Sequence, residues 1–195
     1  MSGQQDSEKP RRCGVVVPVP PEIGAQFSAV HERFLRERMH NPVHVTVVYP
    51  FLQKGDIESR CSIIGSVCSE FPMFDVSLSE VDTFPEARVV FLKIRDEGNL
   101  HRLHLRLIQA LGLEEDEESE FRAFERDNYL PHITLGADFS PAEFNAAWSE
   151  LRERSFTGQF RVTRLCLYQE VGERVWEETA CFSLKGATGS RSESG

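Results

Sequence analysis

Two copies of the pattern His-x-Thr, at His44 and Thr46 and again at His132 and Thr134, each lie within apolar sequence. On a β-strand, side chains two positions apart point to the same face, so each histidine shares a face with its threonine. A buried strand does not normally carry imidazole and hydroxyl groups together without a partner for them. A single copy could arise by chance among six histidines and be satisfied by a backbone carbonyl. Two copies in matching positions of a repeated unit favour a functional site.

Two imidazoles facing one group are suited to hydrolysis of a phosphodiester without a metal. One neutral imidazole takes a proton from water, and the other, protonated, gives a proton to the departing ribose oxygen. Histidine titrates at about 6.5 when unperturbed, so a pair can hold opposite protonation states near neutral pH. The hydroxyls of Thr46 and Thr134 could donate hydrogen bonds to the nonbridging phosphate oxygens. The sequence does not decide which histidine is the acid and which is the base.

The segments that must position these motifs alternate between strand and helix patterns. Strands are expected at 13–19, 43–51, 74–79, 88–94, 129–137, 160–169 and 175–184, and helices at 22–38, 57–71, 100–111 and 141–151. Asp56 is the expected N-cap of one helix, and Ser140 opens another as a capping box. Gly112 is expected to end a helix, and Gly172 to lie in a hairpin turn between the last two strands.

The order of these segments contains a weak internal duplication. A strand, a helix and a strand with His44 are followed later by a strand, a helix and a strand with His132. This order favours an α+β fold that is bilobal, with two antiparallel-rich sheets, outer helices, a central cleft and a pseudo-two-fold relation between the lobes. We expect a disordered leader at 1–12, one bilobal domain at 13–185 and a disordered tail at 186–195.

The composition limits the classes of partner. The chain has 195 residues, of which 40% are hydrophobic, and a net charge of −9; its pI is near 5.2. An acidic chain lacks the broad basic surface that binds duplex DNA. No apolar run approaches the ~20 residues of a membrane-spanning helix, and 1–12 lacks a hydrophobic signal core. The expectation is a cytoplasmic or nuclear monomer that does not contact membranes.

The five cysteines are odd in number and form no Cys-x-x-Cys pair, so we expect buried free thiols. Cys61 and Cys68 are seven positions apart and should share one apolar helical face. The five are Cys13, Cys61, Cys68, Cys166 and Cys181.

The other histidine patterns do not indicate a metal site. His101 and His104 would be neighbours on one helix face, but no third ligand is evident, and the arginines around them indicate a solvated face. His31 with Glu32 begins like a zinc protease motif, yet Leu35 stands where the second histidine belongs. The sequence therefore predicts no metal.

The doubled motif, with Tyr-Pro-Phe at 49–51 after the first copy and Pro131 before the second, resembles the 2H phosphoesterase superfamily, which includes the 2'-5' RNA ligase and cyclic phosphodiesterase group. The resemblance extends over about 12–185. It implies a bilobal fold with a central groove, no metal or cofactor, and action on 2',3'-cyclic phosphates, 1'',2''-cyclic phosphates or RNA ends. By this resemblance the catalytic residues are His44, Thr46, His132 and Thr134.

One departure from the family pattern affects the expected substrate. Many bacterial relatives have a basic residue after the second motif, whereas Gly136 and Ala137 stand there in this chain. This difference and the acidic charge disfavour RNA ligation and binding of long RNA, because affinity for polyanions rests on neutralising phosphates.

The sequence therefore predicts a metal-independent cyclic phosphodiesterase that hydrolyses a 2',3'-cyclic or ADP-ribose cyclic phosphate on a small nucleotide or RNA terminus. Tyr49 and Tyr129 are candidates to stack on a base, with core packing as the alternative for both. Two alternatives remain open: an RNA-end-processing enzyme (a 2'-5' ligase or a 3' exonuclease), and a non-catalytic module that binds nucleotides or RNA ends.

Overall fold

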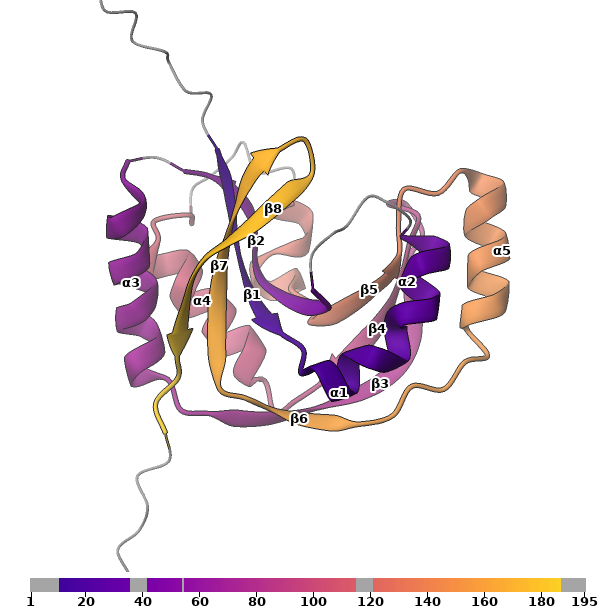
Figure 1. Cartoon of the computed structure of the whole chain (residues 1–195), viewed down its shortest axis with the longest axis horizontal. Coiled ribbons are helices and arrows are strands. Elements are labelled where there is room, and N and C mark those ends of the chain that lie inside the picture. Colours follow the sequence, from indigo (N-terminus) through magenta and orange to yellow (C-terminus); the bar gives the residue numbers. More distant parts are fainter. Residues whose placement is uncertain (1–10, 36–41, 54, 115–120, 187–195) are drawn as a thin grey trace, which may run out of the picture.

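Two four-stranded sheets form the molecule, and each has one motif strand at its edge (Figure 1). The computed structural model describes residues 11–35, 42–53, 55–114 and 121–186. The first sheet has the order β2-β1-β7-β8 and the second β5-β4-β3-β6. The strands are β1 (Arg12–Pro18), β2 (His44–Leu52), β3 (Phe74–Phe84), β4 (Val89–Arg95), β5 (His132–Gly136), β6 (Gln159–Val162), β7 (Arg164–Gly172) and β8 (Val175–Ser183).

All the strand pairs within the two sheets are antiparallel. The edge strands β2 and β5 contact each other in the middle of the molecule. The predicted duplication is visible in the topology, because β1 pairs with β2 as β4 pairs with β5, with helices in each connection. We call β1 to β2 the first unit and β4 to β5 the second unit. The α+β fold of two antiparallel sheets with outer helices is confirmed.

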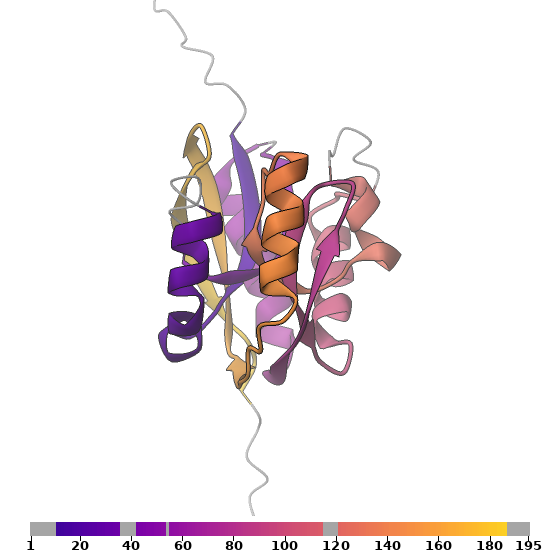
Figure 2. The same cartoon turned by 90° about the vertical axis from the view of Figure 1, so that its right-hand side faces the viewer.

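The helices cover the outer faces of both sheets. They are α1 (Pro21–Gly24), α2 (Ser28–Phe34), α3 (Ile57–Glu70), α4 (Asn99–Ala110) and α5 (Pro141–Leu151), with short 3-10 turns at Ala25–Phe27, Arg122–Phe124 and Arg126–Asn128. α3 and α4 lie on the first sheet, and α2 and α5 lie on the second (Figures 1 and 2). None of the helices in the described part of the chain is long and apolar enough to cross a membrane.

In each unit, the helix between the two strands packs on the motif strand of the other unit. α2 belongs to the first unit but packs on β5 of the second, and α4 belongs to the second unit but packs on β2 of the first. The buried side of α4 is apolar at Leu100, Leu103 and Leu107, which share one helical face at spacings of three and four. Each motif strand is therefore covered by a helix from the opposite unit.

Local signals in the sequence explain where several helices begin and end. The Asp56 carboxylate accepts a hydrogen bond from the Ser59 amide at 2.7 Å, and Ser140 with Glu143 forms the expected capping box. Gly112 follows α4 with φ +68°, a conformation that glycine adopts without strain. These expectations are confirmed.

Two expected elements are divided in the structure. The helix expected at 22–38 is broken into α1, a 3-10 turn and α2, which ends at Phe34. The strand expected at 160–169 divides at Thr163, because β6 pairs with β3 in the second sheet while β7 pairs with β1 in the first. Residues 1–10, 36–41 and 187–195 lie outside the described part of the chain. Most of the expected leader (1–12) and tail (186–195) falls within these ranges.

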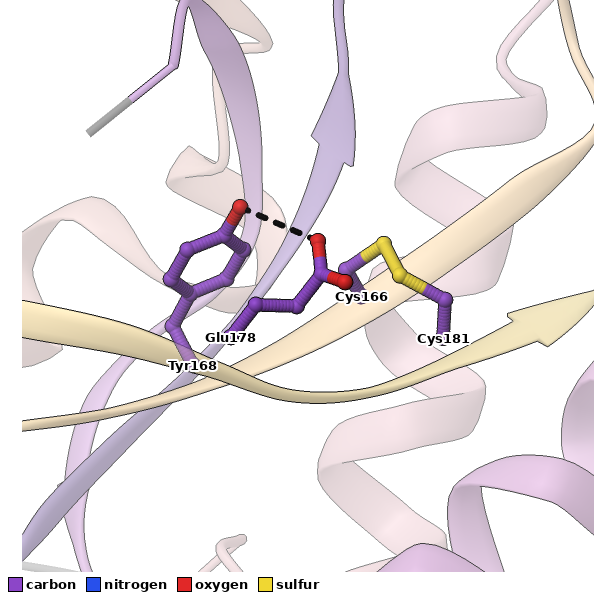
Figure 3. The surroundings of a disulfide bond; sticks show 4 residues. All are labelled: Cys166, Tyr168, Glu178 and Cys181. Carbon is purple, nitrogen blue, oxygen red and sulfur yellow. Dashed lines mark hydrogen bonds between the residues drawn. A yellow bond between two sulfur atoms is a disulfide. The ribbon is translucent and has the colours of Figure 1, made fainter.

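The expectation of free thiols is wrong for two of the five cysteines. Cys166 on β7 and Cys181 on β8 stand directly opposite each other in the antiparallel register and form a disulfide (Figure 3). The register brings together two residues that are 15 positions apart, which cysteine spacing alone does not reveal. Of the others, Cys13 and Cys68 are buried free thiols and Cys61 is partly exposed.

Candidate active site

The four motif side chains line one cavity of about 340 Å³ between the two sheets. His44 and Thr46 come from β2, and His132 and Thr134 come from β5, so the structure brings together segments nearly ninety positions apart. The rest of the lining is mostly apolar or aromatic: Gly14, Val16, Val48, Tyr49, Pro50, Phe84, Ala87, Val89, Phe121, Phe124, Ala137, Tyr168 and Trp176. No Lys, Arg, Asp or Glu of the described residues lines the cavity.

The strand period places these side chains as the sequence predicts. Val45 and Ile133, which separate each histidine from its threonine, are 0% and 1% exposed and belong to the hydrophobic core. The histidines and threonines on the opposite faces are half-buried. Alternation along each strand therefore divides the side chains between core and cavity.

Each motif strand has an irregularity directly after its threonine. On β2, Thr46 pairs with Val16 and Val48 pairs with Val15, which leaves Val47 as an extra residue. On β5, the pairing passes from Thr134 to Gly136 in the same way and leaves Leu135 unmatched. Such bulges bend a strand and redirect its side chains, and they are common beside active sites.

The two catalytic candidates hold their rings in the same way. Nδ1 of His44 bonds to the Pro42 carbonyl at 2.8 Å, and Nδ1 of His132 bonds to the Leu130 carbonyl at 2.7 Å. A carbonyl oxygen only accepts hydrogen bonds, so Nδ1 carries the proton in both neutral rings. Nε2 of each ring is therefore the nitrogen that can accept or deliver a proton in the cavity.

The surroundings of the two rings differ. The His132 ring lies 5.3 Å from Phe84 and 4.9 Å from Phe91, centroid to centroid. Burial lowers the pKa of His132 to about 4, and the charge of His44 adds to this lowering while the carbonyl bond opposes it. Burial also lowers the pKa of His44, against the effect of its own carbonyl bond. Both rings are consequently neutral at pH 7 in the free protein.

Tyr49 lies in the cavity wall but is only 8% exposed. Its ring stacks on Phe121 at 5.3 Å and meets the edge of Tyr129 at 6.5 Å. Burial raises the pKa of its hydroxyl. Tyr49 is thus both a core side chain and a lining residue of the cavity. Its position is compatible with both predicted roles, which are stacking on a nucleobase and packing in the core.

Tyr129 does not line the cavity. Its hydroxyl donates a hydrogen bond to the Thr46 carbonyl at 2.8 Å, and its ring stacks on His104 at 4.3 Å with an interplanar angle of 6°. Burial raises its pKa well above the usual value. The geometry does not support base stacking for this residue and instead places it behind the first motif.

The expectation of a solvated face around His104 is wrong, because this side chain is 0% exposed. Nδ1 donates to the Val47 carbonyl at 2.6 Å, and Nε2 accepts from the Arg126 amide at 2.8 Å. Both nitrogens are therefore occupied by backbone groups, and neither has a lone pair for a metal. The spacing of His104 from Leu100 and Leu107 already places it on the apolar face of the helix, a signal that the neighbouring arginines obscured.

His31 also lies beside the motif strands, which the sequence does not predict. This residue is on α2, and its Nε2 lies 3.0 Å from the Thr134 carbonyl on β5. The ring stacks on Phe27 at 6.0 Å, and burial lowers its pKa. No motif marks it, because its position depends on the packing of α2 on the opposite unit.

Comparisons with known sequences show the family of the chain. A family model described as the 2'-5' RNA ligase superfamily matches residues 19–174. A Geobacillus kaustophilus protein named "Putative phosphoesterase" is 23% identical over 177 residues, which cover 90% of this chain and 97% of that protein. A Halalkalibacterium halodurans protein with the same description is 26% identical over 145 residues, which cover 73% of this chain and 80% of that one.

Solved structures share the fold. A Thermus thermophilus protein matches with a TM-score of 0.64 and 21% identity, over 90% of this chain and 99% of that chain. LigT of E. coli, crystallised with 3'-AMP, matches with a TM-score of 0.61 and 20% identity, over 91% of this chain and 99% of its own.

Proposed function

The chain belongs to the 2'-5' RNA ligase superfamily, and from this membership we propose that it is a metal-independent phosphodiesterase that opens a cyclic nucleotide phosphate. The observation that carries the proposal is the convergence of two His-x-Thr pairs, from edge strands of different sheets, on one cavity. A phosphorus atom between the two rings would have a proton acceptor on one side and a proton donor on the other.

We assign His132 as the general base and His44 as the general acid. This assignment follows from the pKa of His132, which burial and the charge of His44 lower to about 4, so that this ring is in the neutral form that a base requires. In the reaction, water attacks phosphorus and gives a proton to Nε2 of His132 while Nε2 of His44 protonates the departing ribose oxygen. One phosphorus–oxygen bond forms and one breaks, and the product is a phosphomonoester with a free hydroxyl. Thr46 and Thr134 donate hydrogen bonds to the nonbridging oxygens.

The cavity favours a substrate of low charge. Its described lining has aromatic rings from both sheets and no cationic side chain to neutralise several phosphates. A cyclic phosphate carries a single negative charge, whereas nucleotide di- and triphosphates and RNA chains carry more. The complex of LigT with 3'-AMP supports a small nucleotide as ligand, since that protein has the same fold.

The direct test is steady-state hydrolysis of 2',3'-cyclic nucleotides in the presence of a chelator. His44→Ala and His132→Ala should each lose about 10² to 10⁴-fold in kcat, as expected for removal of a general acid or base. Full activity in both variants would refute the proposal.

The same experiment separates the alternatives. Joining of 2'-5' linked RNA, or trimming of 3' ends, without opening of cyclic phosphates would identify an RNA-end-processing enzyme. Saturable binding of AMP by calorimetry without any product would identify a binding module.

A further inference from the structure

Each motif threonine has its carbonyl bonded by a side chain from the opposite unit. The Thr46 carbonyl on β2 accepts from the Tyr129 hydroxyl at 2.8 Å, and Tyr129 belongs to the second unit. The Thr134 carbonyl on β5 lies 3.0 Å from Nε2 of His31, which belongs to the first unit. The relation is reciprocal, and it concerns the same backbone atom of the two duplicated motifs.

These carbonyls need partners because β2 and β5 are edge strands. An edge strand pairs on one side only, and its outer backbone groups must be satisfied by water or by side chains. In this chain the outer edges of β2 and β5 face each other at the cavity. The Tyr129 bond therefore connects β2 to the residues just before β5, and the His31 bond connects β5 to α2, the helix that precedes β2 in the chain.

Both donors are themselves held in place. Tyr129 stacks on His104, and the His104 ring donates to the carbonyl of Val47, the bulge residue next to Thr46. His31 stacks on Phe27, which is completely buried. A donor with a fixed ring holds the backbone carbonyl that it bonds in a fixed position.

We propose that His31 and Tyr129 are positioning residues that form a reciprocal clamp and set the separation of His44 from His132. The clamp acts through the threonine carbonyls, each two residues from a catalytic ring. A misplacement of about 1 Å can cost about 10²-fold in rate, so a clamp on this gap acts on kcat. The inference rests on the proposed function, but the clamp itself can be tested without turnover.

The kinetic test removes each donor while retaining its ring. Tyr129→Phe and His31→Phe should each lower kcat about 10 to 100-fold while KM changes little, because the misplaced groups act in the transition state. His31→Gln keeps an N–H donor at the end of the side chain and should recover most of the rate. Arg60→Met is the matched control, since it removes a donor to the Leu111 carbonyl between α3 and α4, away from the cavity.

Unchanged kcat in both phenylalanine variants would overturn the clamp. An equal loss in Arg60→Met would also overturn it, because the effect would then follow from general loosening of the fold. A loss in His31→Phe that His31→Gln does not relieve would have the same consequence, since the hydrogen bond would not be the active feature.

A second measurement reads the gap without activity. The pKa of His132 is measured by NMR of its ring, with and without His44→Gln, in the parent protein and in Tyr129→Phe. In the parent, removing His44 should raise the pKa of His132, because the His44 charge lowers it. In Tyr129→Phe this effect should shrink, since electrostatic coupling falls with distance. An equal effect in both backgrounds would overturn the clamp, and absence of turnover in the parent would refute only the proposed function.

Discussion

His44 and His132 are anchored alike, each through Nδ1 to the carbonyl two residues earlier in the chain, at 2.8 and 2.7 Å. The duplication thus extends from the topology to the tautomer of each ring. The difference between them lies in the surroundings. The His132 ring packs against Phe84 and Phe91, and the charge of His44 lowers the pKa of His132. Similar anchors with different surroundings give two chemically distinct imidazoles, which acid–base catalysis requires.

The pH profile of kcat/KM should be bell-shaped with an acidic optimum. Activity rises as His132 loses its proton near its pKa of about 4. It falls again as His44 loses its proton at a pKa below its ordinary value of 6.5. Initial rates at low substrate concentration between about pH 3.5 and 9 would give the profile of the free enzyme. An optimum on the alkaline side would contradict the assignment of these two rings.

The stability of the fold should decrease on acidification because of His104. Burial lowers its pKa from 6.5 to about 4, so the unfolded chain binds more protons than the native state in this interval. The stabilising contribution is complete above about pH 6.5 and is lost as the pH falls toward about 4, which amounts to about 3 kcal/mol. Denaturant unfolding gives the free energy of unfolding at pH 7 and at pH 4.5. The difference between these two values should be smaller for His104→Gln than for the parent. An equal difference in both proteins would contradict the prediction.

Removal of the motif hydroxyls should affect kcat more than stability. Thr46 and Thr134 are half-buried, and valine has nearly the same shape as threonine. Loss of one hydrogen-bond donor to the developing charge typically costs about 10² to 10³-fold in kcat, so Thr46→Val and Thr134→Val should fall in this range. Thr163→Val, at an exposed position outside the cavity, is the control. Parent-like kcat in both cavity variants would remove the threonines from the mechanism.

The four motif residues could be predicted from the sequence because their arrangement depends on strand alternation, a period of two that is visible in the residue types. The roles of His31 and His104 could not, because each bonds to a backbone carbonyl on a strand of the opposite unit. The Cys166–Cys181 pair depends on the register of β7 with β8. Local pattern therefore identified the catalytic candidates, whereas contacts between the units decided what surrounds them.

Substitutions of Trp176 and Tyr49 can show where the nucleobase of the substrate binds. Tyr49 is 8% exposed with its ring against Phe121, whereas Trp176 on β8 is only partly buried and also lines the cavity. Stacking of a base on an aromatic ring is worth about 1 to 3 kcal/mol, so Trp176→Ala should raise KM about tenfold if the base stacks there. Tyr49→Ala should mainly lower the unfolding midpoint. The reverse pattern in kinetics and thermal unfolding would assign the base to Tyr49 instead.

The disulfide should stabilise the fold and leave the chemistry in place. Cys166 and Cys181 close a loop with a sequence separation of 15, for which the entropy of the unfolded chain predicts about 3 kcal/mol. Cys166 packs with Val16 and Tyr168, which line the cavity, but neither sulfur atom touches the rings of His44 and His132 in the described contacts. Cys166→Ala with Cys181→Ala should therefore lower the free energy of unfolding while kcat stays close to that of the parent. A parent-like stability would show that the bond contributes little, and a large loss of kcat would show that β7 and β8 help to shape the site.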